Sequence, residues 1–290
     1  MPRQTPPVVL TIAGFDPSSG AGITADIKTI AAHGCYGISC ITALTVQSTS
    51  GVRQVEPVRP ELVSATLTEL IADVDVAAVH IGMLASAPVV AAVVEFLESN
   101  QLENVVLDPI LRSSSGKDLL DPAGRKLLKQ KLIPLCTALT PNVDEAAVLT
   151  GLPVTDQDQM RAAAHALHKQ GAGAVVITGG HLEKAIDLLS MSNGKGTPTQ
   201  EEFGSERIKT TSTHGTGCAF ATALAANLAH GKQLYDAVVL AKTYVRTAIA
   251  RAHALGKGNG PVNHLYRLEE QPRATVADVL LPVHGGGGAH

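Results

Sequence analysis

Aromatic residues are scarce in this 290-residue chain, which has no Trp, four Phe and four Tyr. Few side chains can therefore stack on nucleic-acid bases, and a formal net charge of −3 gives no basic surface, so we expect no nucleic-acid partner. The four cysteines form no Cys-x-x-Cys pair and show no metal-ligand spacing, which is typical of reduced cytosolic thiols. No apolar run reaches the roughly 18 residues of a membrane span, and no signal-like segment opens the chain, so we expect a cytoplasmic protein with no membrane partner.

Apolar residues make up 45% of the chain, which is enough for one large α/β core. Apolar runs of strand length alternate with patterns of helix length. The runs predict strands at Val8–Ala13, Gly37–Val46, Val76–Ile81, Val105–Asp108, Ala138–Leu139 and Ala174–Thr178. The longer patterns predict helices at Ala21–His33, Pro60–Asp73, Pro88–Glu98, Pro122–Lys131, Asp144–Leu149, Asp156–Gln170, Ala219–His230 and Leu234–Ala254. Such alternation indicates a mostly parallel sheet with helices on both faces.

These elements predict one domain over residues 1–270. The polar segment 192–206 is rich in Gly, Thr and Glu and is expected to form a surface hairpin or loop. Residues 271–290 end in Gly-Gly-Gly-Gly-Ala-His, and we expect them to be a disordered tail.

Residues able to carry chemistry follow the predicted strands one after another. They are Asp16, Gln47, Met83, Asp108, the pair Asn142 and Glu145, and Gly179-Gly180. Because ligands of parallel sheets bind outside the carboxyl ends of the strands, this one-sided placement predicts a site along that edge.

The segment Thr213-His-Gly-Thr-Gly-Cys218 precedes a predicted helix of small residues. Its two glycines let backbone N–H groups turn toward one point, and the helix adds unpaired donors and the positive end of its dipole. An anion such as a phosphate fits there, with Cys218 facing it, which suits phosphoryl transfer. The alternative is a tight turn followed by a buried cysteine.

The common nucleotide-binding and zinc-binding motifs do not explain the function of this chain. A Gly-x4-Gly-Lys-[Ser/Thr] P-loop is absent. Gly20-Ala-Gly-Ile-Thr-Ala25 has the form of a dinucleotide fingerprint but lies beyond the strand end, where that motif does not belong. We expect His80, His181 and His214 to be hydrogen-bonded structural residues and not zinc ligands.

Three segments together carry a resemblance: residues 11–29, residues 41–52, and Thr213–Cys218. The shorter motifs Ile81-Gly-Met83-Leu, Leu107-Asp108-Pro, Thr140-Pro-Asn142-x-x-Glu145-Ala and Gly260-Pro-Val-Asn-His add to them. The chain resembles the hydroxymethylpyrimidine/phosphomethylpyrimidine kinases of thiamine biosynthesis, within the ribokinase superfamily. The resemblance implies a ribokinase-like three-layer α/β/α sandwich. It also implies an ATP- and Mg²⁺-dependent kinase that phosphorylates a hydroxymethyl group and then its phosphate ester.

The resemblance also implies roles for individual residues. The pyrimidine pocket would be lined by Gly14, Asp16, Gln47 and Met83; the nucleotide would meet Asn142, Thr178 and Gly180; Asp108 and Glu145 would hold Mg²⁺; and Gly215, Thr216, Gly217 and Cys218 would form the catalytic anion hole. Simpler alternatives are that Gln47 ends a strand, Asp16 makes a turn, and Glu145 interacts with a helix dipole.

Cys218 takes the place of the Asp base of related sugar kinases. We expect the helix N-terminus to lower the pKa of its thiol, so that Cys218 accepts the substrate proton late in the transfer with a modest contribution to the rate.

The chain departs from the family pattern at three positions. Thr178 stands where a Lys is usual, Arg112 where an aliphatic residue is common, and Phe15 where Ser or Thr is usual. Two other functions compete: pyridoxal kinase, and a catalytically idle protein that binds pyrimidine or pyridoxal phosphate. Ala and Val on several faces of residues 234–254 are compatible with a homodimer, which is the assembly we expect.

Overall fold

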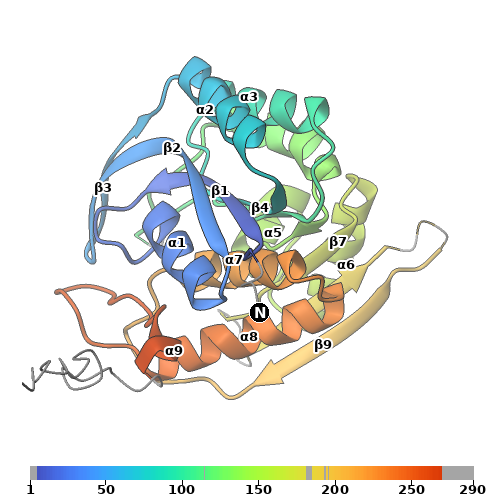
Figure 1. Ribbon diagram of the computed structural model, residues 1–290. Coiled ribbons are helices and arrows are strands. Elements are labelled where there is room, and N and C mark those ends of the chain that lie inside the picture. The colour runs from blue at the N-terminus through green and yellow to red at the C-terminus, as the bar shows by residue number, and fades with distance from the viewer. Residues whose placement is uncertain (1–4, 114, 181–184, 193, 195, 270–290) are drawn as a thin grey trace, which may run out of the picture.

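The computed structural model describes residues 5–113, 115–180, 185–192, 194, 196–269. The predicted tail at 271–290 lies outside them. Nine strands form one sheet in the order β3-β2-β1-β4-β5-β6-β7-β8-β9, with helices on both faces (Figure 1). This arrangement confirms the predicted three-layer α/β/α fold.

Six neighbouring strands of the sheet run parallel: β2 (Tyr36–Ser48), β1 (Val8–Phe15), β4 (Val76–Ile81), β5 (Val105–Leu107), β6 (Ala138–Leu139) and β7 (Ala174–Ile177). They correspond to the six predicted strands. Three antiparallel strands complete the sheet: β3 (Gly51–Pro57) beside β2, and β8 (Ala185–Met191) and β9 (Thr199–Ser205) beyond β7. The sequence analysis missed β3. The hairpin expected near 192–206 is present as β8–β9, although its first strand lies before that segment.

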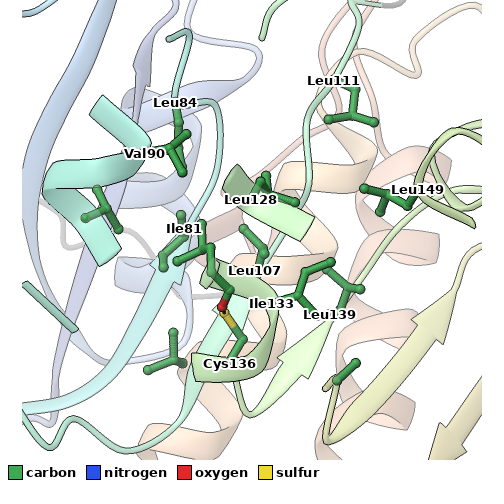
Figure 2. Close-up of a cluster of buried hydrophobic side chains, with 14 of the residues drawn as sticks. Ile81, Leu84, Val90, Leu107, Leu111, Leu128, Ile133, Cys136, Leu139 and Leu149 are labelled. Atoms are coloured by element: carbon green, nitrogen blue, oxygen red, sulfur yellow. The ribbon is translucent and has the colours of Figure 1, made fainter. Parts of the chain in front are cut away.

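Alternating side chains of the parallel strands face two separate cores. In β7, Val175 and Ile177 face one core, and Ala174 and Val176 face the other. The first core packs against α2 (Pro60–Asp73), α3 (Ala87–Ser99), α4 (Pro122–Leu127), α5 (Val143–Thr150) and α6 (Gln157–Lys169), and Figure 2 shows part of it. The second packs against α1 (Gly22–Ala32), α7 (Thr216–Ala229), α8 (Leu234–Ala250) and α9 (Tyr266–Glu269). Burial on both faces explains why these strands are continuously apolar.

The helix predicted to run regularly to Lys131 does not do so. Its α-helical part ends at Leu127, a π turn follows over Leu128–Leu132, and a 3₁₀ turn follows over Ile133–Leu135. Pro134 accounts for the change, because it has no N–H and its ring clashes with the carbonyl four residues earlier.

In the part of the chain that the structure describes, every helix is too short or too polar to cross a membrane.

Candidate active site

The loop after β1 is organised around the buried carboxylate of Asp16. Oδ1 accepts hydrogen bonds from the backbone N–H of Ser18 at 2.8 Å and from its hydroxyl at 2.7 Å. Oδ2 accepts from the backbone N–H of Ala21 at 3.0 Å and lies 2.8 Å from Nε2 of His214. Burial opposes ionisation of this carboxyl, but the hydrogen bonds from His214 and Ser18 outweigh it, and the pKa of Asp16 lies below its usual value.

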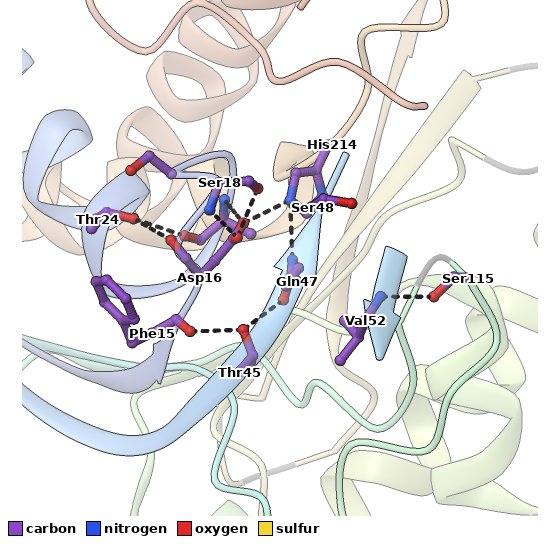
Figure 3. A network of polar contacts seen from close by, with 12 residues as sticks. Phe15, Asp16, Ser18, Thr24, Thr45, Gln47, Ser48, Val52, Ser115 and His214 are labelled. Atoms are coloured by element: carbon purple, nitrogen blue, oxygen red, sulfur yellow. Dashed lines mark hydrogen bonds and ion pairs between the residues drawn. The ribbon is translucent and has the colours of Figure 1, made fainter. Parts of the chain in front are cut away.

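His214 connects this loop to the end of β2. Its Nε2 lies 3.3 Å from the amide nitrogen of Gln47 (Figure 3). The amide oxygen of Gln47 lies 3.2 Å from the hydroxyl of Thr45. The Thr45 hydroxyl is also 2.9 Å from the carbonyl oxygen of Phe15. The structure thus brings Asp16 and Gln47 together through a histidine that the sequence analysis had taken as structural.

Gly14 and Met83, the other two predicted pocket residues, lie against each other. A Cβ added at Gly14 would lie 3.2 Å from the Met83 sulfur, so a larger residue there would press on the methionine. Met83 is buried, and its carbonyl oxygen accepts a hydrogen bond from the Thr42 hydroxyl at 2.5 Å. The ends of β1 and β4 are therefore in contact.

The predicted anion hole lies at the start of α7. Its N-cap residue, Gly215, has a φ of +81°, in the left-handed region that favours glycine. A Cβ there would overlap the carbonyl oxygen of Gly20, so the loop after β1 packs directly on the helix N-terminus. The first backbone N–H groups of α7 have no partners within the helix; that of Thr216 donates to the carbonyl oxygen of Thr213 at 3.4 Å, and those of Gly217 and Cys218 follow it at the end where an anion can bind.

Cys218 is buried in the first turn of α7, three residues after Gly215. Its thiol donates a hydrogen bond to Asp108 and accepts one from the backbone N–H of Gly22. Burial first, and then the negative charge of Asp108, raise the pKa of this thiol well above its usual value. The expected lowering by the helix N-terminus was therefore wrong, because burial first, and then carboxylates from distant parts of the chain, outweigh the dipole.

Asp108 lies directly after β5 and faces the anion hole. A Cβ added at Gly217 would be 3.7 Å from its Oδ2. Burial, followed by the negative charges of Glu145 and Asp26, raises the pKa of Asp108 well above its usual range. Burial also raises the pKa of Glu145 to about 7. Buried carboxylates that repel one another in this way form a natural site for a cation.

Asn142 and Glu145 form a capping box at the start of α5. The Asn142 side-chain oxygen accepts from the Glu145 backbone N–H, and a Glu145 carboxylate oxygen accepts from the Asn142 backbone N–H, both at 2.9 Å. Glu145 thus lies in the first helical turn, where the simpler alternative also placed it. Thr178, directly after β7, pairs with Asn142 through an isolated β-bridge. It therefore lies beside Asn142 at the carboxyl ends of the parallel strands.

Residues 16–263 match the model of the phosphomethylpyrimidine kinase family. The chain belongs to this family.

Curated relatives in the family align over nearly their whole length. The hydroxymethylpyrimidine/phosphomethylpyrimidine kinase of Escherichia coli is 42% identical over 262 residues, covering 89% of this chain and 97% of the relative. That of Haemophilus influenzae is 41% identical over 261 residues, covering 88% and 96%. The chain spans only 53% of a bifunctional thiamine biosynthesis protein of Geobacter sulfurreducens, to which it is 42% identical over 262 residues.

Solved structures share the fold. A phosphomethylpyrimidine kinase of Clostridium difficile has a TM-score of 0.75 and 36% identity, covering 84% of this chain and 99% of that one. The pyridoxal kinase of Bacillus subtilis, solved as an ADP complex, has a TM-score of 0.82 and 34% identity, covering 91% and 100%. The family's fold is therefore the one described above.

The positions that depart from the family pattern lie in different surroundings. Arg112 forms a surface ion pair with Asp118 at 3.1 Å. Thr178 donates its backbone N–H to a neighbouring carbonyl oxygen at 2.9 Å. Arg207, which the sequence analysis missed, donates from its guanidinium to the carbonyl oxygen of Gly180, so a cation lies beside this glycine loop.

A second set of buried polar residues includes three that were not predicted, Thr11, Asp26 and Thr222. His80 lies among them, with its Nδ1 3.2 Å from the Thr11 hydroxyl, which confirms its expected role as a hydrogen-bonded structural residue. The Asp26 carboxylate accepts from the hydroxyls of Thr11 at 2.7 Å and Thr222 at 2.9 Å, which ties β1, α1 and α7 together beneath the anion hole.

Proposed function

We propose that this protein transfers a phosphoryl group from ATP to 4-amino-5-hydroxymethyl-2-methylpyrimidine or its monophosphate; its family, named phosphomethylpyrimidine kinase, supports this. The observation that carries the proposal is the packing of the α7 N-terminus, which includes Cys218, against buried Asp108. This arrangement offers donors for the transferring phosphoryl group and carboxylates for a counter-cation at one point.

The donor set suits Mg²⁺. This ion usually takes one or two carboxylates and completes its shell with phosphate oxygens and water. Asp108 would hold the ion directly. Glu145 already accepts backbone hydrogen bonds from Asn142 and Leu111, so it would act through water. When bound, Mg²⁺ would neutralise the phosphate charge.

The residues of the chain would then act mainly by positioning. Backbone N–H groups of Gly215, Thr216, Gly217 and Cys218 would stabilise the charge on the transferring group, which matters most for a loose transition state. Cys218 would accept the hydroxyl proton late in the transfer. Its raised pKa makes the thiolate scarce, in agreement with a modest contribution to the rate.

The nucleotide would lie along the neighbouring strand ends. Asn142 and Thr178 are adjacent there, and Gly180 follows with its exposed backbone. AMP-PCP occupies a pyridoxal kinase of Staphylococcus aureus that shares the fold, with a TM-score of 0.80 and 30% identity, which supports an ATP site in this architecture. A cytoplasmic location and a homodimer stay predictions.

The test is a coupled ATP-consumption assay with Mg²⁺, run on the hydroxymethylpyrimidine, its monophosphate and pyridoxal. Pyridoxal is included because pyridoxal kinases share the fold. We expect turnover of the pyrimidines. Turnover of pyridoxal alone would assign the protein to vitamin B6 salvage, and no turnover with ligand-induced thermal stabilisation would indicate a binding protein.

A further inference from the structure

The hydrogen-bonding capacity of Asp16 is already used by the protein. An ionised carboxylate has about four lone-pair sites and no proton to donate. Two donors from Ser18 occupy Oδ1, and Ala21 N–H and His214 occupy Oδ2. A substrate could reach Asp16 only by displacing one of them. Because the carboxylate can only accept, Nε2 of His214 must carry the proton of the 2.8 Å contact.

The proton on His214 determines how the Gln47 amide is turned. In the structure the Gln47 amide nitrogen lies 3.3 Å from His214 Nε2, but a protonated Nε2 has no lone pair to accept an N–H. The amide oxygen lies 3.2 Å from the Thr45 hydroxyl. That hydroxyl has a single proton, which the Phe15 carbonyl oxygen takes at 2.9 Å, so it offers Gln47 only lone pairs.

Both contacts therefore favour the amide turned end for end from this placement. The Gln47 carbonyl oxygen would then face His214, and its NH₂ group would face Thr45. Amide oxygen and nitrogen have nearly the same shape, so their positions follow from the hydrogen-bond network around them. In this orientation one N–H and one oxygen lone pair of the amide stay available to a ligand, in a fixed order.

We propose that Asp16 and His214 are positioning residues that fix the orientation of the Gln47 amide and thereby select a 4-aminopyrimidine edge over a 4-oxopyrimidine edge. This inference rests on the proposed function. An aminopyrimidine presents a ring-nitrogen acceptor beside an amino donor. The oxo form presents the reverse order, an N–H donor beside a carbonyl acceptor. An amide held in one orientation pairs with only one of these edges, whereas an amide free to turn pairs with both.

The histidine is itself held in place. Its backbone N–H donates to the carbonyl oxygen of Gly260 at 3.0 Å. A Cβ at Gly20 would overlap its ring, so the imidazole packs directly on the backbone of the loop after β1. The selecting element is therefore built from β1, β2 and the segment before α7, which meet only in the folded protein (Figure 3).

The experiment measures kcat and KM for 4-amino-5-hydroxymethyl-2-methylpyrimidine and for its 4-oxo counterpart. His214→Leu removes the donor, whereas His214→Gln keeps an N–H able to reach both acceptors. We expect His214→Leu to lower the amino/oxo ratio of kcat/KM at least about tenfold, mainly through KM, and His214→Gln to restore most of it. His165→Leu, which replaces an exposed histidine on α6, is the control and should leave the ratio unchanged.

The outcomes separate the two proposals. A wild-type protein that phosphorylates neither pyrimidine would refute the proposed function. Wild-type activity with an unchanged ratio in His214→Leu, even at lower overall activity, would overturn the inference and leave His214 a structural role. If His214→Leu does not fold, Asp16→Asn provides the second test. Its amide N–H would donate to Nε2 and move the imidazole proton, so the ratio should shift toward the oxo compound; an unchanged ratio would again overturn the inference.

Discussion

Replacing Gly215 with Ala should impair the protein far more than the same change at the other end of the same helix. Gly215 opens α7 with a φ of +81°, and Gly231 follows its end with a φ of +74°. An alanine in this region costs about 1–2 kcal/mol. The two positions differ in their surroundings. A Cβ added at Gly215 would overlap the carbonyl oxygen of Gly20, whereas no atom lies within 4 Å of a Cβ added at Gly231. Gly231→Ala is thus a matched control with the strain but without the clash.

The overlap at Gly215→Ala forces the helix N-terminus and the loop after β1 apart by more than about 1 Å. Misplacement of about 1 Å can reduce a rate by about 100-fold. We therefore expect kcat/KM to fall about 100-fold or more, and the free energy of unfolding to fall by about 2–4 kcal/mol. Gly231→Ala should lose only about 1–2 kcal/mol and keep its activity. Coupled assays and urea unfolding measure both. Equal behaviour of the two variants would refute the described contact.

Three further results are expected. Cys218→Ala should lower kcat less than about tenfold, because positioning carries most of the catalysis; a loss above about 100-fold in steady-state assays would instead make the thiol an essential base. Thr178→Lys should lower KM for ATP several-fold by adding a cation, with Thr178→Gln as the uncharged control; an unchanged KM would indicate that Arg207 already supplies the charge. Burial, followed by the charge of Lys28, lowers the pKa of His264 to about 4, below its unfolded value, so stability should be lost as the pH falls from about 6.5 toward 4. Urea unfolding at pH 7 and pH 5 should differ by about 2 kcal/mol from this residue, and His264→Leu should reduce the difference; no difference would contradict its buried, neutral state.

The parallel part of the sheet was predictable because its strands are buried on both faces. Ala174–Ile177 is apolar without interruption, and Val76–Ile81 is interrupted only by His80, which is a strong local signal. The edge strand β3 gives no such signal. In Gly51–Pro57 only the two valines are apolar, and both are partly exposed. Its pairing with β2 forms only in the folded sheet, so the local sequence pattern does not predict it.

The placement of the site along one sheet edge was also predictable, but its internal chemistry was not. His214 is 198 residues from Asp16 in the sequence, so no spacing rule connects them. The thiol of Cys218 shows the same limit. A helix N-terminus predicts a lowered pKa, but burial first, and then the charges of Asp108 and Asp26 from other parts of the chain, reverse the direction. Local rules assign a residue its neighbours in sequence, whereas its electrostatics depend on neighbours in space.

Burial of α7 on all sides has a consequence for how the protein opens. From Cys218 to Leu228 every residue of this helix is buried. Its hydrogen-bonded amide protons should therefore exchange with solvent only when the whole domain unfolds, while those of β3 exchange through local opening. Deuterium uptake along α7 would then report global stability directly. The anion-binding turn leads directly into this buried helix. Phosphate binding and the folded core should therefore be lost in the same unfolding transition.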